Sequence, residues 1–443
     1  VMNIIESQKS LDKIVDRLNN SIAIPIYCND VQHVIQNNIS LFIFLTKQGE
    51  IYVIPISHPE AVWTSSIQSL NQAISNYVIY TIDKKSMLHY FDCELIDINM
   101  IEWIKTGNIL DQENANTTTH DFYTSRFWNR SDTNQIIPIY KHVEKIQLIK
   151  DKLIPYINDS VCETDYFKTY NEAVLIFLHE IEKQGLVTST GVEYTQYNPY
   201  TTTGRPSNRF NGVNYAALNK EDGSRERFVS RFSDGKLIEM DFDAYHIRLI
   251  ADVLNYKLPD GSVHEYLGKQ YFGKDTLTKE EYNESKEISF RILYGGVPKE
   301  FMQIEFFKKV DNLIKQLWIE FKQKNSIPTY LFKRPMYNSV LKNMTPQKLF
   351  NYYIQSLETE SNISILAEIY KVMQKYRSKL VLYTYDSFLF DFDSADGQIF
   401  IKDVIDSIKF PVKLKHGYNY NNMTGIEHEL ETTYWWMHNR LVL

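Results

Sequence analysis

The chain has few cysteines, no excess of positive charge and no long apolar run, and each absence excludes a class of protein. Its three cysteines, Cys28, Cys93 and Cys162, are scattered and odd in number. They therefore form neither a disulfide framework nor a metal-spaced cluster, and we expect a reducing compartment. No apolar run approaches the ~20 residues that span a bilayer, and the first residues lack a signal-peptide pattern, so we expect no membrane partner.

The chain has 443 residues, enough for two or three domains with a sizeable core, and a formal net charge of -7. Binding to nucleic acid would therefore depend on local positive surface. The segment 301–345 offers such a surface, because it carries eight lysines and arginines against three acidic residues. The alternative interpretation is a solvated face of a helix.

The first 125 residues have the pattern of an α/β domain. Short apolar runs bounded by Asn, Asp and Gly predict three strands, at 21–27, 41–45 and 51–56, of which the last two form a hairpin. The polar stretch Asp111–Thr119 is the best candidate for a domain boundary. Apolar residues at three- and four-residue spacing then predict two helices, over about 139–153 and about 166–183.

Two aspartates, Asp241 and Asp386, each follow a strand-like run. Asp241 precedes a segment with a helical pattern, Ile247–Leu254, and Asp386 lies between two apolar runs that predict a buried hairpin. Carboxylates fixed on adjacent strands can hold two Mg²⁺ ions roughly 3.5–4 Å apart, the arrangement for in-line phosphoryl transfer. The alternatives are a helix N-cap for Asp241 and an ordinary turn residue for Asp386.

Lys286, Phe290 and Tyr294 stand at positions i, i+4 and i+8, so they share one face of a predicted helix that ends at Gly295. A lysine supplies a point charge for phosphate, and aromatic rings can stack on a base or a sugar. The alternative is an amphipathic helix that packs its aromatic residues inward.

Three further residues carry weaker signals of nucleic-acid binding. Arg205 lies in a polar, glycine-containing segment, and Asn351 and Gln355 stand four apart on a predicted helix over 348–358. An arginine can bind phosphate or a base edge, and amide side chains can donate to minor-groove acceptors. A surface loop and a solvated helix face are the alternatives.

In this order and spacing, the segments of the chain resemble the family A DNA polymerases, the bacterial polymerase I type, and especially short phage-like members. The resemblance covers roughly residues 199–422. Thr203–Ser207 is similar to the family's TGR motif, Asp241–Ala251 to motif A, Lys286–Gly295 to motif B, and Tyr385-Asp386 to motif C. Asn351 and Gln355 fall at the positions that contact the minor groove.

The resemblance implies an α/β (α+β) chain with a right-hand polymerase fold, made of palm, fingers and a reduced thumb, behind a ribonuclease H-like exonuclease-type α/β domain. A reduced thumb is expected because fewer than about twenty residues separate Gly185 from the TGR motif, too few for two long helices. The expected boundaries are 1–125 for a degenerate 3′–5′ exonuclease-like domain, 126–198 for a helical connector or reduced thumb, 199–275 for the first part of the palm, 276–345 for the fingers, and 346–443 for the second part of the palm with a C-terminal extension.

Carried over residue by residue, the resemblance implies a two-metal site that uses Mg²⁺, with Mn²⁺ able to substitute. The catalytic residues would be Asp241, Asp386 and Lys286. The metal ligands would be Asp241, the carbonyl of Phe242, and Asp386. The incoming nucleotide would contact Lys286, Phe290, Tyr294, His246 and Arg291. The primer-template DNA would contact Arg205, Arg248, Asn351, Gln355 and Tyr385.

The chain departs from the family pattern at three positions of this site. His246 stands where motif A usually has a glutamate that excludes ribose, so discrimination between the two sugars stays open. Tyr282 replaces an arginine that normally precedes Lys286, so Arg291 is expected to help meet the triphosphate charge. Ser387 replaces the glutamate that normally follows the aspartate of motif C.

The segment 49–58 resembles two strands of the family's exonuclease domain, but the expected carboxylates are absent. Met87 takes the place of a metal-binding aspartate, and the strand that ends at Tyr27 lacks the usual Asp-x-Glu pair. Metal-dependent hydrolysis needs several carboxylates that converge on two ions. The resemblance therefore predicts a domain without proofreading activity.

The expected function is a DNA-directed DNA polymerase that adds deoxynucleotides to a primer 3′-hydroxyl in phage-type DNA replication. The expected partners are primer-template DNA, dNTPs, and a processivity factor or other replisome partner, in the cytoplasm (the host cytoplasm if the chain is viral). Two alternatives stay open. One is an RNA- or primer-synthesising polymerase of the same palm type, which His246 favours, and the other is a non-catalytic polymerase-like subunit that binds DNA.

Overall fold

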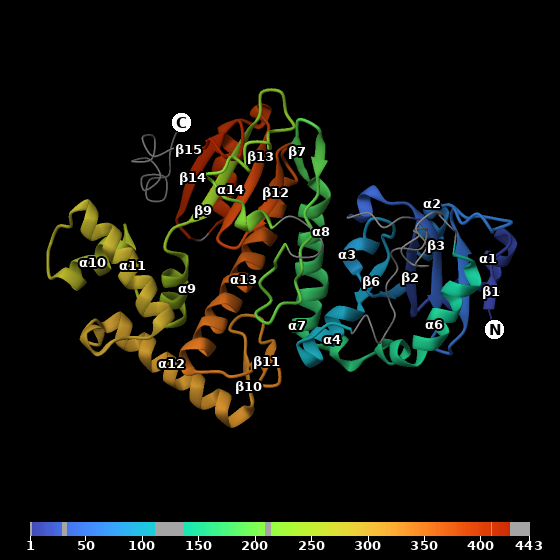
Figure 1. The fold of residues 1–443 in the computed structure, drawn as a ribbon, viewed down its shortest axis with the longest axis horizontal. Coiled ribbons are helices and arrows are strands. Elements are labelled where there is room, and N and C mark those ends of the chain that lie inside the picture. Colours follow the sequence, from blue (N-terminus) through green and yellow to red (C-terminus); the bar gives the residue numbers. More distant parts are fainter. Residues whose placement is uncertain (1, 29–32, 111–136, 209–213, 409, 426–443) are drawn as a thin grey trace. The chain divides into compact units, whose positions relative to one another are not determined.

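The computed structural model describes residues 2–28, 33–110, 137–208, 214–408 and 410–425 (Figure 1). The chain divides into two compact units, Val1–Lys183 and Gln184–Leu443. The predicted boundary at Asp111–Thr119 lies outside the described residues. None of the helices in the described ranges is long and apolar enough to cross a membrane.

The first unit is built on a six-stranded sheet in the order β1-β4-β3-β2-β5-β6. The strands are β1 (Met2–Ile4), β2 (Ser21–Tyr27), β3 (Ile39–Leu45), β4 (Ile51–Pro55), β5 (Val78–Thr81) and β6 (Glu94–Asp97). β3 runs antiparallel to β2 and β4, whereas β2, β5 and β6 are parallel to one another. The three predicted strands and the hairpin between β3 and β4 are confirmed, and the sheet contains both parallel and antiparallel pairs.

Helices complete this unit. They are α1 (Gln8–Ile14), α2 (Ile67–Ile74), α3 (Lys84–Met87), α4 (Ile98–Thr106), α6 (Ile139–Leu153), α7 (Asp165–Lys168) and α8 (Leu175–Gln184). All seven residues of β3 are buried, because apolar side chains cover both faces of this strand. The helix predicted at 139–153 is α6, and the one predicted at 166–183 is α7 and α8 joined by a π-helical turn, Thr169–Val174.

The first unit therefore ends inside the segment 126–198, which was predicted to form a connector or reduced thumb. The helices α6, α7 and most of α8 belong to the same compact unit as the six-stranded sheet. Their role as a thumb stays a prediction.

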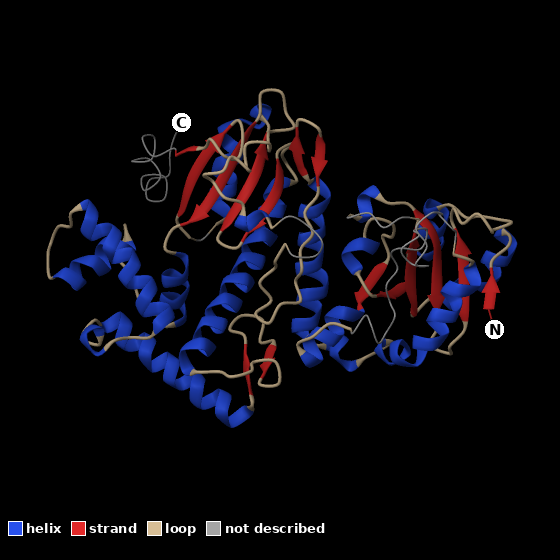
Figure 2. Cartoon of the chain, viewed as in Figure 1, coloured by secondary structure: helices blue, strands red, loops and turns tan. Residues whose placement is uncertain are grey.

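The second unit contains a five-stranded antiparallel sheet in the order β12-β13-β9-β14-β15. These strands are β9 (Lys236–Phe242), β12 (Lys379–Thr384), β13 (Ser387–Phe392), β14 (Val412–Gly417) and β15 (Thr424–Gly425). Two small hairpins pair β7 (Leu186–Thr188) with β8 (Gly191–Glu193) and β10 (Ser326–Pro328) with β11 (Pro335–Tyr337). Figure 2 shows the five-stranded sheet at one end of this unit and a helical region at the other.

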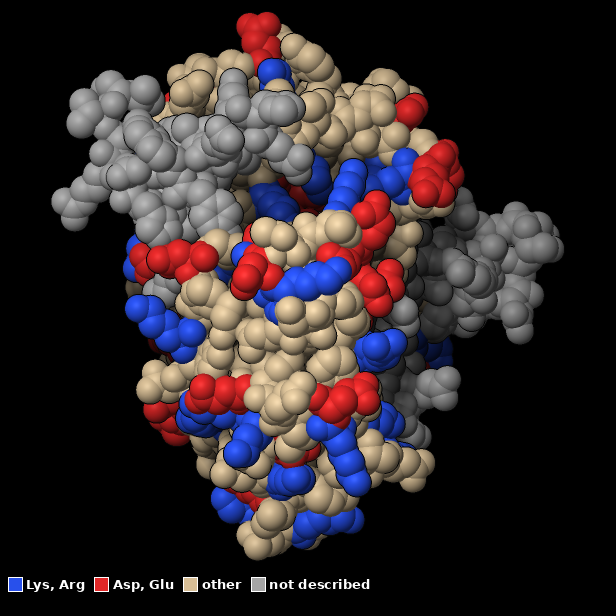
Figure 3. Space-filling view, turned by 90° about the vertical axis from the view of Figure 1, so that its left-hand side faces the viewer, with Lys and Arg blue, Asp and Glu red and all other residues tan. Residues whose placement is uncertain are grey.

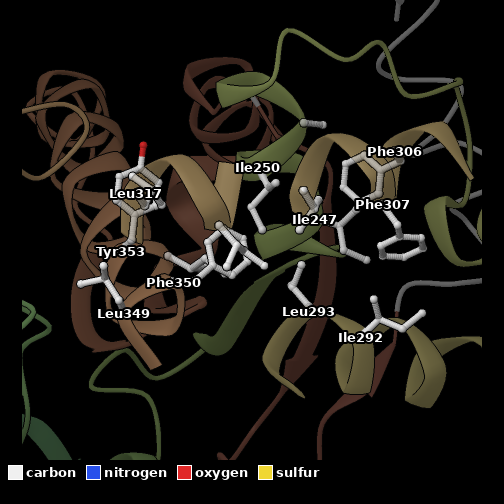
Figure 4. Close-up of a cluster of buried hydrophobic side chains, with 14 of the residues drawn as sticks. Ile247, Ile250, Ile292, Leu293, Phe306, Phe307, Leu317, Leu349, Phe350 and Tyr353 are labelled. Carbon is white, nitrogen blue, oxygen red and sulfur yellow. The ribbon is translucent and has the colours of Figure 1, made fainter. Parts of the chain in front are cut away.

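The helices of this unit are α9 (Tyr245–Val253), α10 (Val263–Phe272), α11 (Lys279–Gly295), α12 (Glu305–Lys324), α13 (Pro346–Met373) and α14 (Gly397–Ser407). An apolar cluster joins the helical region, and Figure 4 shows side chains of four helices converging in it, with Ile250 from α9, Leu293 from α11, Phe306 from α12 and Phe350 from α13. This core fixes α9 and α11 against α13. The sequence predicted only residues 348–358 of α13, which continues to Met373.

The basic segment 301–345 forms α12 and the β10–β11 hairpin. Three lysines of α12 pair with acidic residues one turn earlier, at N–O distances of 3.4 Å (Lys309–Glu305), 2.6 Å (Lys315–Asp311) and 2.8 Å (Lys324–Glu320). Basic and acidic side chains are mixed over the lower part of the face drawn in Figure 3. The interpretation of α12 as a solvated helix face is therefore the better one.

Candidate active site

The five-stranded sheet brings the two predicted aspartates together. β9 lies between β13 and β14, and Asp241 is its next-to-last residue, paired with Ser387 of β13. Asp386 stands in the turn between β12 and β13, and its carbonyl accepts a hydrogen bond from the Phe242 amide at 2.9 Å. The residue that caps α9 is Ala244, which has a φ of 48°, so the alternative that Asp241 is a helix N-cap is wrong.

Both aspartates line one polar pocket of about 150 Å³. Glu239 and Tyr385 line it as well, and Lys220 and Arg225 add positive charge to its wall. Figure 3 shows blue side chains in a hollow in the upper half of the drawn face. The sequence alone did not predict Glu239, because a lone glutamate two residues before Asp241 in a strand has no distinctive signal.

Burial and neighbouring carboxylates disfavour the charged forms of both aspartates. Burial, followed by the charge of Asp386, raises the pKa of Asp241 to about 6, and the ammonium groups of Lys415 and Lys413 oppose this rise. Burial and then the charge of Glu358 raise the pKa of Asp386. A cation between the two carboxylates would relieve the repulsion, so this is an environment in which a divalent ion binds favourably.

The donors present suit Mg²⁺. Aspartate oxygens are hard ligands, and Mg²⁺ in sites for phosphoryl transfer is typically bound by one or two carboxylates, with substrate phosphates and waters completing the shell. Within the described part of the chain, no group of three or more His, Cys, Asp or Glu residues is arranged to hold a metal ion. The two aspartates lie together at one pocket, and their role as metal ligands, with the backbone carbonyl of Phe242, stays a prediction.

Two lysines of β14 face this site, and the sequence analysis missed them. In the register of the sheet, Lys413 is opposite Asp241 and Lys415 is opposite Glu239. The Lys413 ammonium is 2.8 Å from Asp243, and the Lys415 ammonium is 3.4 Å from Glu239 and 4.0 Å from Asp241. The alternation of Lys and apolar residues in 412–415 places both lysines on one face, but only the pairing with β9 shows what that face meets.

The face of α11 that carries Lys286, Phe290 and Tyr294 is accessible. The Phe290 side chain is 44% exposed, and its ring lies parallel to that of Tyr294, at an interplanar angle of 3° and a centroid separation of 6.1 Å. The alternative that this helix packs its aromatic residues inward is therefore wrong for Phe290, while Tyr294 packs partly against the apolar core. Arg291 is exposed on the same helix.

Lys286 lies on α11 beside Tyr282 and within electrostatic reach of His264. Its ammonium is 4.5 Å from the centroid of the Tyr282 ring, at the position where the family has an arginine. Burial, together with the charges of Lys286 and Lys413, lowers the pKa of His264 to about 4, and the charge of Asp243 opposes this decrease. Lys286 on α11 and Lys413 on β14 therefore act on the same side chain.

His246, Arg205 and Tyr385 belong to one connected cluster. Glu358 of α13, 1% exposed, forms ion pairs with His246 at 2.9 Å and with Arg205 at 3.0 Å. The Arg205 guanidinium lies 3.7 Å above the ring of Tyr385, and the Tyr294 hydroxyl contacts Nδ1 of His246. Glu358 was not predicted as a site residue, because a single glutamate in a polar stretch of helix has no signal of its own.

The turn that carries Asp386 is held by Asn362, a buried residue of α13 that was also missed. Its amide donates to the Tyr385 carbonyl at 2.5 Å and to the Tyr383 hydroxyl at 2.8 Å, and its oxygen accepts from the Tyr245 hydroxyl at 2.7 Å. Tyr385 has a φ of 59°, a conformation that a bulky residue adopts only under local constraint. Asn362 thus links the turn between β12 and β13 to α9.

The remaining predicted DNA contacts lie on different elements. Asn351 donates to the carbonyl of Tyr294 at 3.3 Å, and Gln355 is half-buried one turn further along α13. The Arg248 guanidinium is bonded to Asp243 and to the Gly261 carbonyl, at 3.0 to 3.3 Å. Arg248 therefore fixes the segment after β9 and is less available than Arg205, whose side chain is 28% exposed.

Comparison with known proteins bears on the fold. No protein-family model and no curated protein matches the sequence. Among solved structures, the chain is similar to the POL domain of Pol1 from M. smegmatis, in a complex with DNA primer-template and dNTP, with a TM-score of 0.72 and 11% sequence identity. The match covers 95% of this chain and 99% of the other. The chain therefore has a polymerase-domain fold of mixed α/β class, as predicted.

Proposed function

We propose that the protein is a DNA-directed DNA polymerase that adds deoxynucleotides to a primer 3′-hydroxyl, and that it acts in phage-type replication. The observation that carries the proposal is the pair Asp241 and Asp386, joined through adjacent strands and lining one polar pocket. The fold adds support, since the solved structure that it resembles is described as a polymerase domain with DNA primer-template and dNTP.

The two aspartates would hold Mg²⁺, which when bound supplies charge for the phosphoryl group and lowers the pKa of the attacking hydroxyl. In such reactions the protein contributes mainly positioning and electrostatic stabilisation. Lys286 would neutralise the triphosphate, and Arg291 on the same helix would add charge. Phe290 offers its exposed ring to the sugar and base, and Tyr294 forms the far end of the same face.

The proposed DNA contacts are Arg205, Asn351, Gln355, Tyr385 and, with its guanidinium partly occupied, Arg248. Base pairs of either order present minor-groove acceptors at similar places. Side chains that donate there test the shape of a pair without reading its sequence. Arg205 is well placed for this role, because it stacks on Tyr385, the residue before Asp386 in the turn between β12 and β13.

The first unit is proposed to lack proofreading activity. Met87, at the place of a metal-binding aspartate, is fully buried in the apolar core beside the sheet, and Tyr27 at the end of β2 is 2% exposed. Asp97, at the end of β6, has a structural role, because it accepts from the backbone amides of Lys84 and Met100. Met87 and Tyr27 supply no carboxylate at the two places where the resemblance expects one.

Extension of a labelled primer on a DNA template with Mg²⁺ tests the proposal, with dNTPs or rNTPs supplied separately. Asp386→Asn should lower the rate of dNTP extension by at least about 10³-fold, because it removes one of the two charges that would hold the metal. The matched control is Asp234→Asn, the same change at an exposed residue in the turn before β9, roughly 23 Å along the chain from Asp241.

Each result has a definite meaning. Template-dependent dNTP extension that is lost only in Asp386→Asn supports the DNA polymerase. Equal or better use of rNTPs would replace it by the RNA-synthesising alternative. Tight primer-template binding without extension by either nucleotide would favour the non-catalytic subunit.

A further inference from the structure

Glu358 is a buried carboxylate with charged partners from two distant segments. It lies on α13 at 1% exposure, His246 is 112 residues before it, and Arg205 is 153 residues before it. A charge buried this deeply is stable only when paired. The two partners, each from another segment, therefore indicate the role of this carboxylate.

The pairing occupies both nitrogens of the His246 ring. A carboxylate can only accept, so Nε2 donates its proton to Glu358 across 2.9 Å. The other ring nitrogen, Nδ1, is in contact with the hydroxyl of Tyr294. The imidazole is held from two sides, and its nitrogens are already engaged.

The position of this ring relative to a bound nucleotide follows from α11. Lys286 and Tyr294 are eight residues apart, about 12 Å along a helix. In the proposed function, Lys286 stands at the triphosphate end of the nucleotide and Tyr294 at its base end. His246 contacts Tyr294 at the base end, and its charge also acts on Asp386 at the metal end. If α11 binds a nucleotide as proposed, the sugar that spans the two ends would pass the edge of the imidazole.

We propose that Glu358 is a positioning residue that sets discrimination against ribose by holding His246 in this orientation. The inference rests on the proposed polymerase function. A 2′-hydroxyl pressed against a ring whose two nitrogens are engaged finds no hydrogen-bond partner, and an unsatisfied buried hydroxyl is strongly disfavoured. When Glu358 is removed, Nε2 is free to donate to the 2′-hydroxyl, and the ring is free to turn away.

Arg205 gives Glu358 a second effect that can be separated from the first. The guanidinium pairs with Glu358 and stacks on Tyr385, whose neighbour is Asp386. The part of the loss that passes through Arg205 should lower the turnover of dNTP and rNTP by the same factor. Only the ratio of the two efficiencies reports on His246.

The experiment compares kcat/KM for insertion of one dNTP and of the rNTP with the same base. In Glu358→Ala the ratio of dNTP to rNTP efficiency should fall by about tenfold or more, as expected for loss of a hydrogen bond to a charged group. Glu358→Gln keeps an acceptor for Nε2 and should fall between the alanine variant and the wild type. The matched control is Glu360→Gln, a buried glutamate of the same helix that accepts from the Leu331 and Phe332 amides, and it should leave the ratio unchanged.

A double-mutant cycle with His246→Ala identifies the route. If Glu358 acts through His246, the ratio in the double variant with Glu358→Gln equals that of His246→Ala alone. Independent, multiplying effects would overturn the proposal, as would a ratio within twofold of wild type in Glu358→Ala. An equal loss for both nucleotides would reduce Glu358 to a support for Arg205 and would also overturn it.

A second readout separates this inference from the proposed function. A primer that ends in a 3′-dideoxynucleotide forms a complex with template and nucleotide without chemistry, so the affinities for dNTP and rNTP can be measured by titration. Absence of extension by the wild type would refute the polymerase activity. A preference for dNTP that disappears in Glu358→Ala would still support the positioning role, and its persistence would refute that role.

Discussion

Asn362 offers a direct test of how the turn between β12 and β13, which carries Asp386, is held. Its fully buried side chain makes three hydrogen bonds, to the Tyr245 and Tyr383 hydroxyls and to the Tyr385 carbonyl. Asn362→Leu is close to the original side chain in size but can make none of them. The substitution therefore leaves three polar groups in the interior short of a partner.

The magnitude follows from these three groups. An unsatisfied buried donor or acceptor costs about 1–3 kcal/mol. The Tyr245 hydroxyl also interacts with Ser361, which places its loss at the low end, so the sum is about 3–7 kcal/mol. For a unit of this size each kcal/mol lowers the unfolding midpoint by roughly 2–4 °C, and we expect the midpoint of the second unit to decrease by about 6 °C or more.

Scanning calorimetry of the full chain measures this decrease. The control is Asn351→Leu, the same change three turns earlier on α13 at a half-exposed position, which should lower the midpoint by no more than about 2 °C. In primer extension, Asn362→Leu should reduce kcat more than the affinity for DNA, since the turn that carries Asp386 loosens. A midpoint for Asn362→Leu within 2 °C of the wild type would refute the reasoning.

Two further predictions concern stability. Burial lowers the pKa of His142 to about 3 and those of His89 and His179 to about 4, so the unfolded chain, whose imidazoles titrate near 6.5, takes up protons first as the pH falls. The free energy of unfolding of the first unit should therefore decrease by on the order of 2 kcal/mol per histidine between pH 6.5 and pH 5. Hydrogen exchange of its strands measures this decrease, and unchanged protection over this interval would contradict the assignment. A Cβ at position 417 would lie 2.5 Å from a backbone oxygen of the next turn, so Gly417→Ala should destabilise the second unit by about 1–3 kcal/mol. The control is Gly295→Ala, whose Cβ meets no atom within 4 Å and which should not destabilise the unit. Equal unfolding midpoints for the two variants would be evidence against this packing.

Local sequence determined most of the regular structure. The apolar runs that predicted β2, β3 and β4 are strands in the structure, and the helix predicted over about 139–153 is α6. Each of these signals comes from neighbouring residues, because alternation, helical spacing and a proline act within one turn or one strand. The two aspartates were identified on the same basis, as carboxylates at the ends of apolar strands.

The long helix α13 shows where local signals fail. Residues 358–362, Glu-Thr-Glu-Ser-Asn, are all polar, and a helix with an exposed side was expected to end among them. All five are buried. Their partners come from other segments, since Glu358 meets His246 and Asn362 meets Tyr245, and no periodicity within the helix can reveal a contact over more than a hundred residues.

The sequence by itself therefore determined which residues form strands and helices, where the two aspartates stand, and which side of α11 carries its lysine and aromatic rings. The tertiary structure decided what these residues meet. The register of β14 against β9 sets Lys413 opposite Asp241, and the packing of α9 on α13 gives His246 its carboxylate. The physical reason is that backbone propensities and periodicity are local, whereas the pairing of buried charges is settled only when distant elements pack together and leave no water to solvate them.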